Sequence, residues 1–206
     1  EALAAHEALA AHEALATHEA LAAHEALALN FDLKNTVVIG IPDSGIIAAK
    51  SYANKLNLNY NQWIHKNPNA QRSFIQNNNK ERNEIIKTKF VYDKDKIKDK
   101  IIIIVDDTIV RGNVIKNIIM NIKHYGAKEI HVRIPSPPVR HICQFGVDIP
   151  TQEELLAHQK YIHDIKKSLN VNSIIYLTNE DLNNIISPQS CKGCFSGCYP
   201  AKALDW

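Results

Sequence analysis

The sequence has no long hydrophobic run, little net charge and few cysteines, and each shortage argues against a class of protein. No apolar stretch approaches the roughly 20 residues that a membrane-spanning helix needs. The 24 Lys and Arg residues nearly balance the 22 Asp and Glu residues, leaving a formal net charge of +2. This balance does not favour nucleic-acid or membrane partners. No secretory signal is visible, so disulfide bonds are not favoured for the four cysteines.

Residues 1–29 differ in composition from everything that follows. The hexad EALAAH repeats through residues 1–28 with one deviation at Thr17. Its Ala, Leu and Glu content favours a helix of roughly 40 Å. A six-residue period turns a helix by about 240°, so the leucines form no single apolar face, and neither a coiled coil nor a core helix is expected. We interpret the repeat as a duplicated, foreign or designed leader. A pH-sensitive, membrane-active helix is the functional alternative.

The stretch at residues 101–112, IIIIVDDTIVRG, predicts a buried strand that ends in a polyanion site. An unbroken aliphatic run is typical of a central strand that is covered on both faces in a parallel sheet. Ligands gather at the carboxyl ends of such strands, where Asp106 and Asp107 stand. Their carboxylates could accept hydrogen bonds from sugar hydroxyls and hold a hard cation. The alternative is a solvated Asp-Asp turn.

Two turns are expected to face anions at this edge. Residues 108–112 form a turn whose backbone N–H groups could face a phosphate, with Arg111 adding positive charge. A second apolar run, residues 37–41, leads into the turn PDSG at 42–45. There Asp43 and Ser44 offer oxygens, and Gly45 lets the backbone approach a ligand closely. A helix N-cap without any ligand would also explain PDSG.

The order of elements predicts an α/β domain over residues 30–187, followed by a cysteine-containing tail over residues 188–206. Strands alternate with helices, so a mostly parallel, doubly wound sheet with flanking helices is expected. The expected strands are 36–41, 59–64, 101–105, 128–134 and 173–177. The expected helices are 45–56, 113–124, 151–168 and 179–186. A polar lid is expected over residues 66–84, and a solvated turn over residues 94–100.

Several of these segments together resemble one family. The segment VDDTIVRG at 105–112 looks like the phosphoribosyl pyrophosphate (PRPP) loop of type I phosphoribosyltransferases, and its ending narrows the likeness to amidophosphoribosyltransferases. The other matching segments are IPDSG at 41–45, QRSFIQ at 71–76, VRIPSPP at 132–138, FGVDIPT at 145–151 and CKGCFSG at 191–197. The resemblance covers roughly residues 34–200 and implies the type I phosphoribosyltransferase fold.

The resemblance also implies roles for residues and a reaction. Asp106 and Asp107 would be the catalytic pair, and with Ser44 they would hold magnesium. The implied PRPP-binding residues are Asp43, Ser44, Gly45, Lys66, Arg72, Asp106, Asp107, Thr108, Ile109, Val110, Arg111 and Gly112. Ammonia would attack the anomeric carbon of PRPP to give phosphoribosylamine and pyrophosphate, the first step of purine synthesis. No histidine is assigned a catalytic role.

The chain departs from the family in two places. Asn113 and Val114 stand where the family usually has hydroxyl residues, and Val114 cannot donate a side-chain hydrogen bond to phosphate. The family's N-terminal glutaminase domain, with its cysteine nucleophile, is not expected here, because Glu1 begins the chain and Cys143 is its first cysteine. Ammonia would then be free or supplied by a separate glutaminase chain. A cytoplasmic homo-oligomer is expected.

The cysteines form a second constellation. In a subgroup of the resembled family, cysteines hold a four-iron, four-sulfur cluster, and Cys143, Cys191 and Cys194 match three of its ligands. The fourth ligand of that subgroup lies before the transferase core, and Cys198 is a candidate substitute. Zinc and reduced free thiols are the alternatives. Two other functions therefore stay open beside the transferase: an inactive PRPP-binding paralogue or regulator, and a metal-binding structural fragment.

Overall fold

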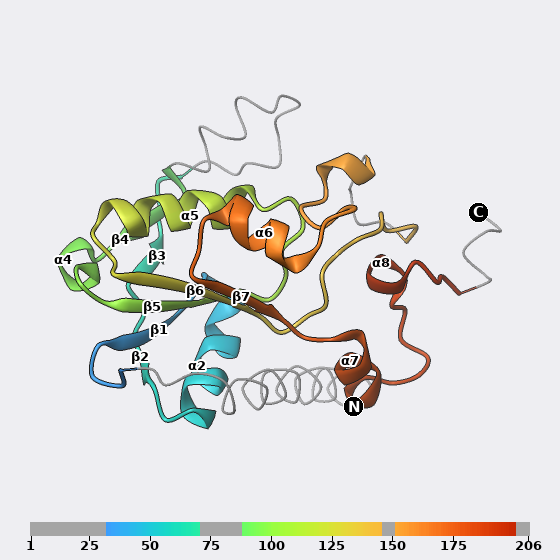
Figure 1. Cartoon of the computed structure of the whole chain (residues 1–206), viewed down its shortest axis with the longest axis horizontal. Coiled ribbons are helices and arrows are strands. Elements are labelled where there is room, and N and C mark those ends of the chain that lie inside the picture. The colour runs from blue at the N-terminus through green and yellow to red at the C-terminus, as the bar shows by residue number, and fades with distance from the viewer. Residues whose placement is uncertain (1–31, 71–87, 146–150, 201–206) are drawn as a thin grey trace.

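A five-stranded parallel sheet forms the centre of the computed structural model, which describes residues 32–70, 88–145 and 151–200 (Figure 1). The strands are β1 (Thr36–Gly40), β2 (Asn59–Tyr60), β5 (Ile101–Val105), β6 (Glu129–Ile134) and β7 (Ser173–Tyr176), in the order β2-β1-β5-β6-β7. Each neighbouring pair in this sheet is parallel. The predicted doubly wound architecture is confirmed. The expected N-terminal repeat helix lies outside the described residues.

Helices cover both faces of the sheet, as the aliphatic run of β5 predicts. Helices α5 (Asn113–His124) and α6 (Ile162–Leu169) lie on one face, while α2 (Gly45–Lys55) and α7 (Asn179–Ile185) lie on the other (Figure 1). In β5, Ile102 and Ile104 pack into the core below α5 and α6, whereas Ile103 and Val105 pack against the α2 side. Every residue of this strand is buried.

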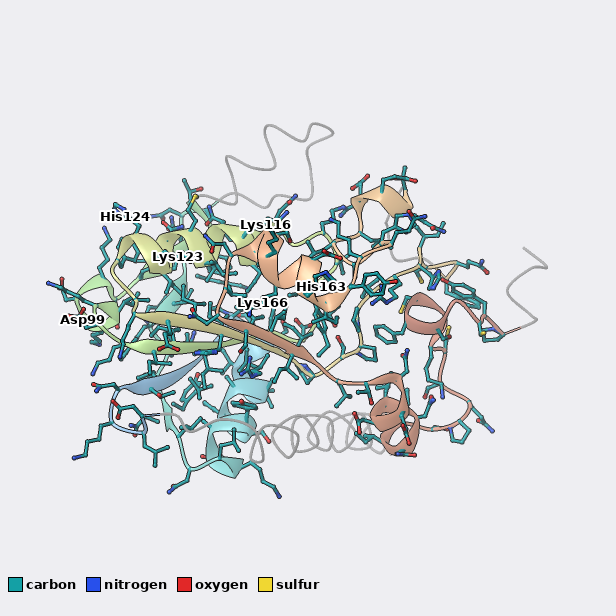
Figure 2. The ribbon with its side chains drawn as sticks, in the orientation of Figure 1. Asp99, Lys116, Lys123, His124, His163 and Lys166 are labelled. Carbon is teal, nitrogen blue, oxygen red and sulfur yellow. The ribbon has the colours of Figure 1, made fainter. Side chains whose placement is uncertain are left out.

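Helix α5 shows how the sequence divides core from surface. Its buried isoleucines 115, 118, 119 and 122 follow the spacing of one helix face. Burying each of these side chains stabilises the fold by about 1.5–3 kcal/mol. The opposite side carries Lys116, Lys123 and His124, which Figure 2 shows along the outside of the domain.

Within the described ranges, no helix has the length and apolar character to cross a membrane.

A small antiparallel hairpin stands apart from the main sheet, and the sequence did not predict it correctly. The segment expected as one strand, residues 59–64, divides into β2 and the start of β3 (Ile64–Lys66). Strand β3 pairs with β4 (Phe90–Tyr92) in a separate two-stranded sheet. The split occurs at Gln62, whose side-chain amide donates to the carbonyl oxygen of Gly40 at 2.9 Å and so ties the hairpin to the end of β1.

The prediction of one long helix over residues 151–168 is wrong. A short 3-10 helix, η2 (Gln152–Glu154), is followed by extended backbone at Leu155, and α6 begins only at Ile162. The helix is interrupted because Leu155 and Leu156 are buried and the Leu156 N–H donates to the carbonyl oxygen of Val110 at 2.8 Å.

Residues 94–97 form a helical turn, α4 (Lys94–Ile97), which buries Ile97. The tail adds a further short helix, α8 (Gly193–Ser196).

Candidate active site

The parallel register of β1 and β5 brings the two predicted anion turns together. Gly40 pairs with Val105 at the carboxyl ends of the two strands. Just beyond, the Ile41 N–H donates to the Val105 carbonyl oxygen at 2.9 Å. The turn at residues 42–45 and the acidic pair that follows β5 therefore begin side by side. The peptide bond between Pro42 and Asp43 is cis.

A hydrogen bond links the two turns directly. The Ser44 hydroxyl donates to Oδ1 of Asp107 at 3.0 Å, across 63 residues of sequence. Ser44 precedes α2, yet its side chain does not cap that helix. Ser44 thus occupies the N-cap position, but its hydroxyl points toward the acidic pair and not to the N–H groups of α2. Side-chain oxygens of three residues, Ser44, Asp106 and Asp107, therefore lie at this edge, where they could serve as metal ligands.

Gly45 allows this close approach, for a reason different from the one expected. A Cβ atom at Gly45 would lie 2.6 Å from the Val105 carbonyl oxygen and 3.1 Å from the Asp106 Cα. Real Cβ atoms do not approach backbone atoms so closely, so any side chain would push α2 away from β5. Glycine is required here by the contact between two protein segments, whereas the sequence suggested contact with a ligand.

The two carboxylates differ in their electrostatics. Asp106 is half-buried and Asp107 is exposed. Burial, together with the neighbouring carboxylate of Asp107, raises the pKa of Asp106 well above its ordinary value, and the charge of Lys89 partly opposes that rise. The Asp107 N–H donates to Oδ1 of Asp106 at 3.1 Å. A divalent cation would relieve the repulsion between these carboxylates, so the charge pattern suits one.

The turn after the acidic pair leads directly into a helix N-terminus, as predicted. Gly112 adopts a left-handed conformation (φ 79°) immediately before α5. Because that helix has 12 residues, its first-turn N–H groups and dipole give this end a positive potential. Asn113 is exposed there. The side chain of Val114 packs against the main core, so the loss of a hydroxyl at this position accompanies a gain in apolar packing.

Two residues outside the loop, Ser136 and Glu154, hold it, and no role was predicted for either. The hydroxyls of Thr108 and Ser136 lie 3.2 Å apart, within hydrogen-bond distance, and Ser136 is buried just beyond β6. The Arg111 Nε donates to Oε2 of Glu154 at 2.5 Å. The predicted positive charge of Arg111 is therefore present in the loop, but it is paired with the Glu154 carboxylate. Ser136 belongs to the segment VRIPSPP at 132–138, whose resemblance to the family predicts no specific role for this serine.

The hairpin of β3 and β4 brings cations to the same edge. Lys66, at the end of β3, forms an ion pair with Asp43. Lys89 precedes β4, and its charge acts on Asp106. Lys89 was not among the predicted site residues, because only the pairing of β3 with β4 places it near the acidic pair. Arg72 lies outside the described residues, as does most of the expected lid.

The described ranges contain no group of three or more His, Cys, Asp and Glu side chains that could hold a metal ion. The predicted magnesium site has two carboxylates and one hydroxyl, and a magnesium ion commonly takes its other ligands from water and substrate phosphates. The thiols of Cys143 and Cys191 lie near enough to Cys194 to add to the effect of burial, which raises the pKa of that thiol. The iron–sulfur or zinc site stays a prediction, and Cys198, its possible fourth ligand, is exposed.

Comparison with known proteins connects this geometry to a family. A family model for the phosphoribosyl transferase domain matches residues 6–135. Amidophosphoribosyltransferase of Pyrococcus horikoshii is 40% identical over 171 residues, covering 82% of this chain and 38% of the relative. Amidophosphoribosyltransferase of Rattus norvegicus is 40% identical over 199 residues, with the same coverage of 82% and 38%. The chain thus spans less than two fifths of the length of these curated relatives.

Solved structures show the same likeness. The allosteric regulatory enzyme of purine biosynthesis has a TM-score of 0.73 and 33% identity, covering 92% of this chain and 41% of that one. Glutamine PRPP amidotransferase from B. subtilis, complexed with ADP and GMP, also has a TM-score of 0.73 and 33% identity, covering 92% and 42%. The expected type I phosphoribosyltransferase fold and the resemblance to amidophosphoribosyltransferases are confirmed.

Proposed function

Because the chain belongs to the phosphoribosyl transferase domain family, we propose that it binds PRPP and transfers the phosphoribosyl group to ammonia. The products would be phosphoribosylamine and pyrophosphate. The observation that carries the proposal is the Ser44–Asp107 hydrogen bond, because it joins the two anion turns into one site at the carboxyl edge of the sheet. The activity of the amidophosphoribosyltransferase relatives points to the same reaction.

The two turns would divide the ligand between them. Backbone N–H groups of residues 108–112 and the start of α5 would bind the 5′-phosphate. The turn at residues 43–45 would face the departing pyrophosphate. Asp106 and Asp107 would accept hydrogen bonds from the ribose hydroxyls. Side-chain oxygens of Ser44, Asp106 and Asp107 would hold a magnesium ion, which when bound supplies positive charge against the pyrophosphate.

The chain's own cations would support bond cleavage. Lys66 and Lys89 lie on the hairpin beside the acidic pair, and Arg72 belongs to the expected lid. Their charges would stabilise pyrophosphate as its bond to the anomeric carbon breaks and the bond to nitrogen forms. The attacking ammonia loses one proton in this exchange, and the departing pyrophosphate or solvent takes it up. No nucleophilic side chain is required for this exchange.

Closure of the lid would exclude water from a centre that hydrolyses readily. We propose further that the ammonia comes from solution or from a glutaminase, and that the protein works as a cytoplasmic homo-oligomer. The cysteines Cys143, Cys191 and Cys194, with Cys198, are proposed as ligands of an iron–sulfur cluster or zinc. Metal analysis of anaerobically purified protein tests this last point, and four freely titratable thiols with no metal would refute it.

Two measurements test the function. Calorimetry with PRPP, with and without magnesium, distinguishes a PRPP-binding protein from a metal-binding structural fragment. Release of pyrophosphate from PRPP in ammonium chloride then distinguishes the enzyme from an inactive regulator, which Asn113 and Val114 would favour. We expect magnesium-dependent binding and ammonia-dependent release. If millimolar PRPP with magnesium produces neither heat nor a shift in melting temperature, the proposed function is wrong.

A further inference from the structure

The end of η2 and the two residues after it touch the phosphate loop at three successive positions, 154–156. The Glu154 carboxylate accepts a hydrogen bond from Arg111 Nε at 2.5 Å. Leu155 is buried in a small apolar cluster against which Val110 packs. The Leu156 N–H donates to the Val110 carbonyl oxygen at 2.8 Å. An ion pair, an apolar contact and a backbone hydrogen bond thus hold the loop from one side.

The side chain of Leu156 completes this contact at the turn that opens α5. Gly112 has φ 79°, and a Cβ built on it would lie 3.0 Å from Leu156 Cδ2. Leu156 therefore packs directly against the left-handed residue of the turn. It is also buried in the core that includes Ile109 and Ile115, which lie on either side of that turn. Residues 154–156 therefore limit how far the loop can move away from the sheet.

The Arg111–Glu154 pair differs from an ordinary surface ion pair in its burial and in its donor atom. The side chains are 29% and 31% exposed, so solvent screens them less than a fully exposed pair. The donor is Nε, which lies next to the aliphatic stem, so the bond also restricts the direction of the whole guanidinium group. A phosphate-binding turn gains affinity when its donors are already arranged before the ligand arrives, because less freedom is lost on binding.

We propose that Glu154 is a positioning residue for the phosphate loop, acting through Arg111 on the turn at residues 110–112. This inference rests on the proposed PRPP function and specifies how the 5′-phosphate half of the site is held. Glu154 contacts the loop and not the reacting atoms, so its role is to arrange the donors. The pyrophosphate half of the site, at residues 43–45, has no share in this contact.

The substitution Glu154→Gln tests the proposal, with Glu153→Gln as the matched control. Both remove one negative charge from η2, but Glu153 is exposed and interacts with Thr151. We expect Glu154→Gln to raise the KM for PRPP about 3- to 10-fold, the size expected for loss of one charge-assisted hydrogen bond in a partly screened position. The value of kcat should change less than about twofold, since at saturation the same complex reacts.

Calorimetry with two fragments of the substrate locates the effect. Glu154→Gln should weaken ribose 5-phosphate binding by the same factor and leave magnesium pyrophosphate binding unchanged. A general loss of structure would weaken the binding of both ligands, and that result would overturn the proposal. Equal KM values for Glu154→Gln, Glu153→Gln and the unaltered protein would also overturn it. If Glu154→Gln melts below the assay temperature, Glu154→Asp keeps the charge with a shorter reach and is compared in the same way.

Failure of the proposed function gives a different result. In that case the unaltered protein itself would bind neither ribose 5-phosphate nor pyrophosphate, and the inference about Glu154 would fall with it. If the unaltered protein binds both ligands and only the Glu154 comparison is negative, the site assignment stands and the positioning role is refuted.

Discussion

The two strand-end turns of this site perform similar tasks but are built in different ways. The turn at residues 42–45 is fixed through its own residues, because Gly45 lets α2 press against the end of β5, Ser44 reaches Asp107 and Asp43 pairs with Lys66. The loop at residues 106–112 is fixed from outside, by Ser136 beyond β6, by Glu154 at the end of η2 and by Leu156 after it. A turn can therefore obtain its rigidity from its own glycine or from neighbouring segments, and substitutions should separate the two.

The largest effect is expected at the acidic pair, which begins the second turn and is hydrogen-bonded to the first through Asp107. Replacing both carboxylates, by Asp106→Asn with Asp107→Asn, should lower pyrophosphate release on the order of 10³-fold, because oxygens for ribose and cation lose their charge. The rate is measured with PRPP, magnesium and ammonium chloride. Asp95→Asn, an exposed change in α4, is the control and should leave the rate unaltered. A double variant that retains more than a tenth of the activity would contradict the assignment.

The next effect is a difference in folding stability between glycine substitutions in the two turns. Gly45→Ala should lower the free energy of unfolding by about 2–3 kcal/mol, because its Cβ would meet backbone that cannot move aside cheaply. Gly112→Ala should lower it less, by about 1–2 kcal/mol, because alanine is strained at positive φ but its Cβ would meet only the end of the Leu156 side chain. Chemical denaturation measures both changes.

Gly126 provides the reference for this comparison. It also has positive φ (86°), but a Cβ there would meet nothing closer than 3.5 Å, at Lys98. The difference between Gly112→Ala and Gly126→Ala therefore isolates the contact with Leu156. If Gly45→Ala proves no more harmful than Gly126→Ala, the account of the first turn is wrong.

A smaller effect, of opposite sign, is expected for Asp106→Asn alone. The folded protein raises the pKa of Asp106 above its ordinary value of 3.8, so the native state binds more protons than the unfolded state above that pH. Stability should fall as pH rises from about 3.8 through the raised pKa. The neutral variant should lack this loss and gain roughly 1 kcal/mol at pH 7. Thermal melts between pH 4 and 8 measure it, and an equally steep pH dependence in the variant would refute the cause.

The smallest effect is expected for Ser44→Ala. The hydroxyl is exposed and its single bond to Asp107 contributes little to folding, so the melting temperature should hardly change. Magnesium-dependent PRPP affinity should fall about 3- to 10-fold, because one oxygen donor to the cation is lost. Calorimetry at several magnesium concentrations measures this. Ser51→Ala, in the same helix and only half-buried, serves as the control.

Some of the site could be predicted from the sequence because its signals are local. The aliphatic run before Asp106 indicated a doubly covered strand, and the parallel order implied that its end lies beside the PDSG turn. The same local reasoning failed for residues 151–168, where a helical pattern is broken by contacts with the phosphate loop. It also missed Lys89, which reaches the site only through the pairing of two short strands.

The sequence by itself determined which aliphatic runs become the central strands β1 and β5 and which polar residues stand at their ends, since both follow from neighbours along the chain. Only the tertiary structure decided that Ser44 turns toward Asp107, that burial raises the pKa of Asp106, and that Glu154 holds Arg111. These relations join residues that are 43 or 63 positions apart, or depend on what covers a carboxyl group. No spacing rule along one chain encodes them, because they arise from how separate elements pack.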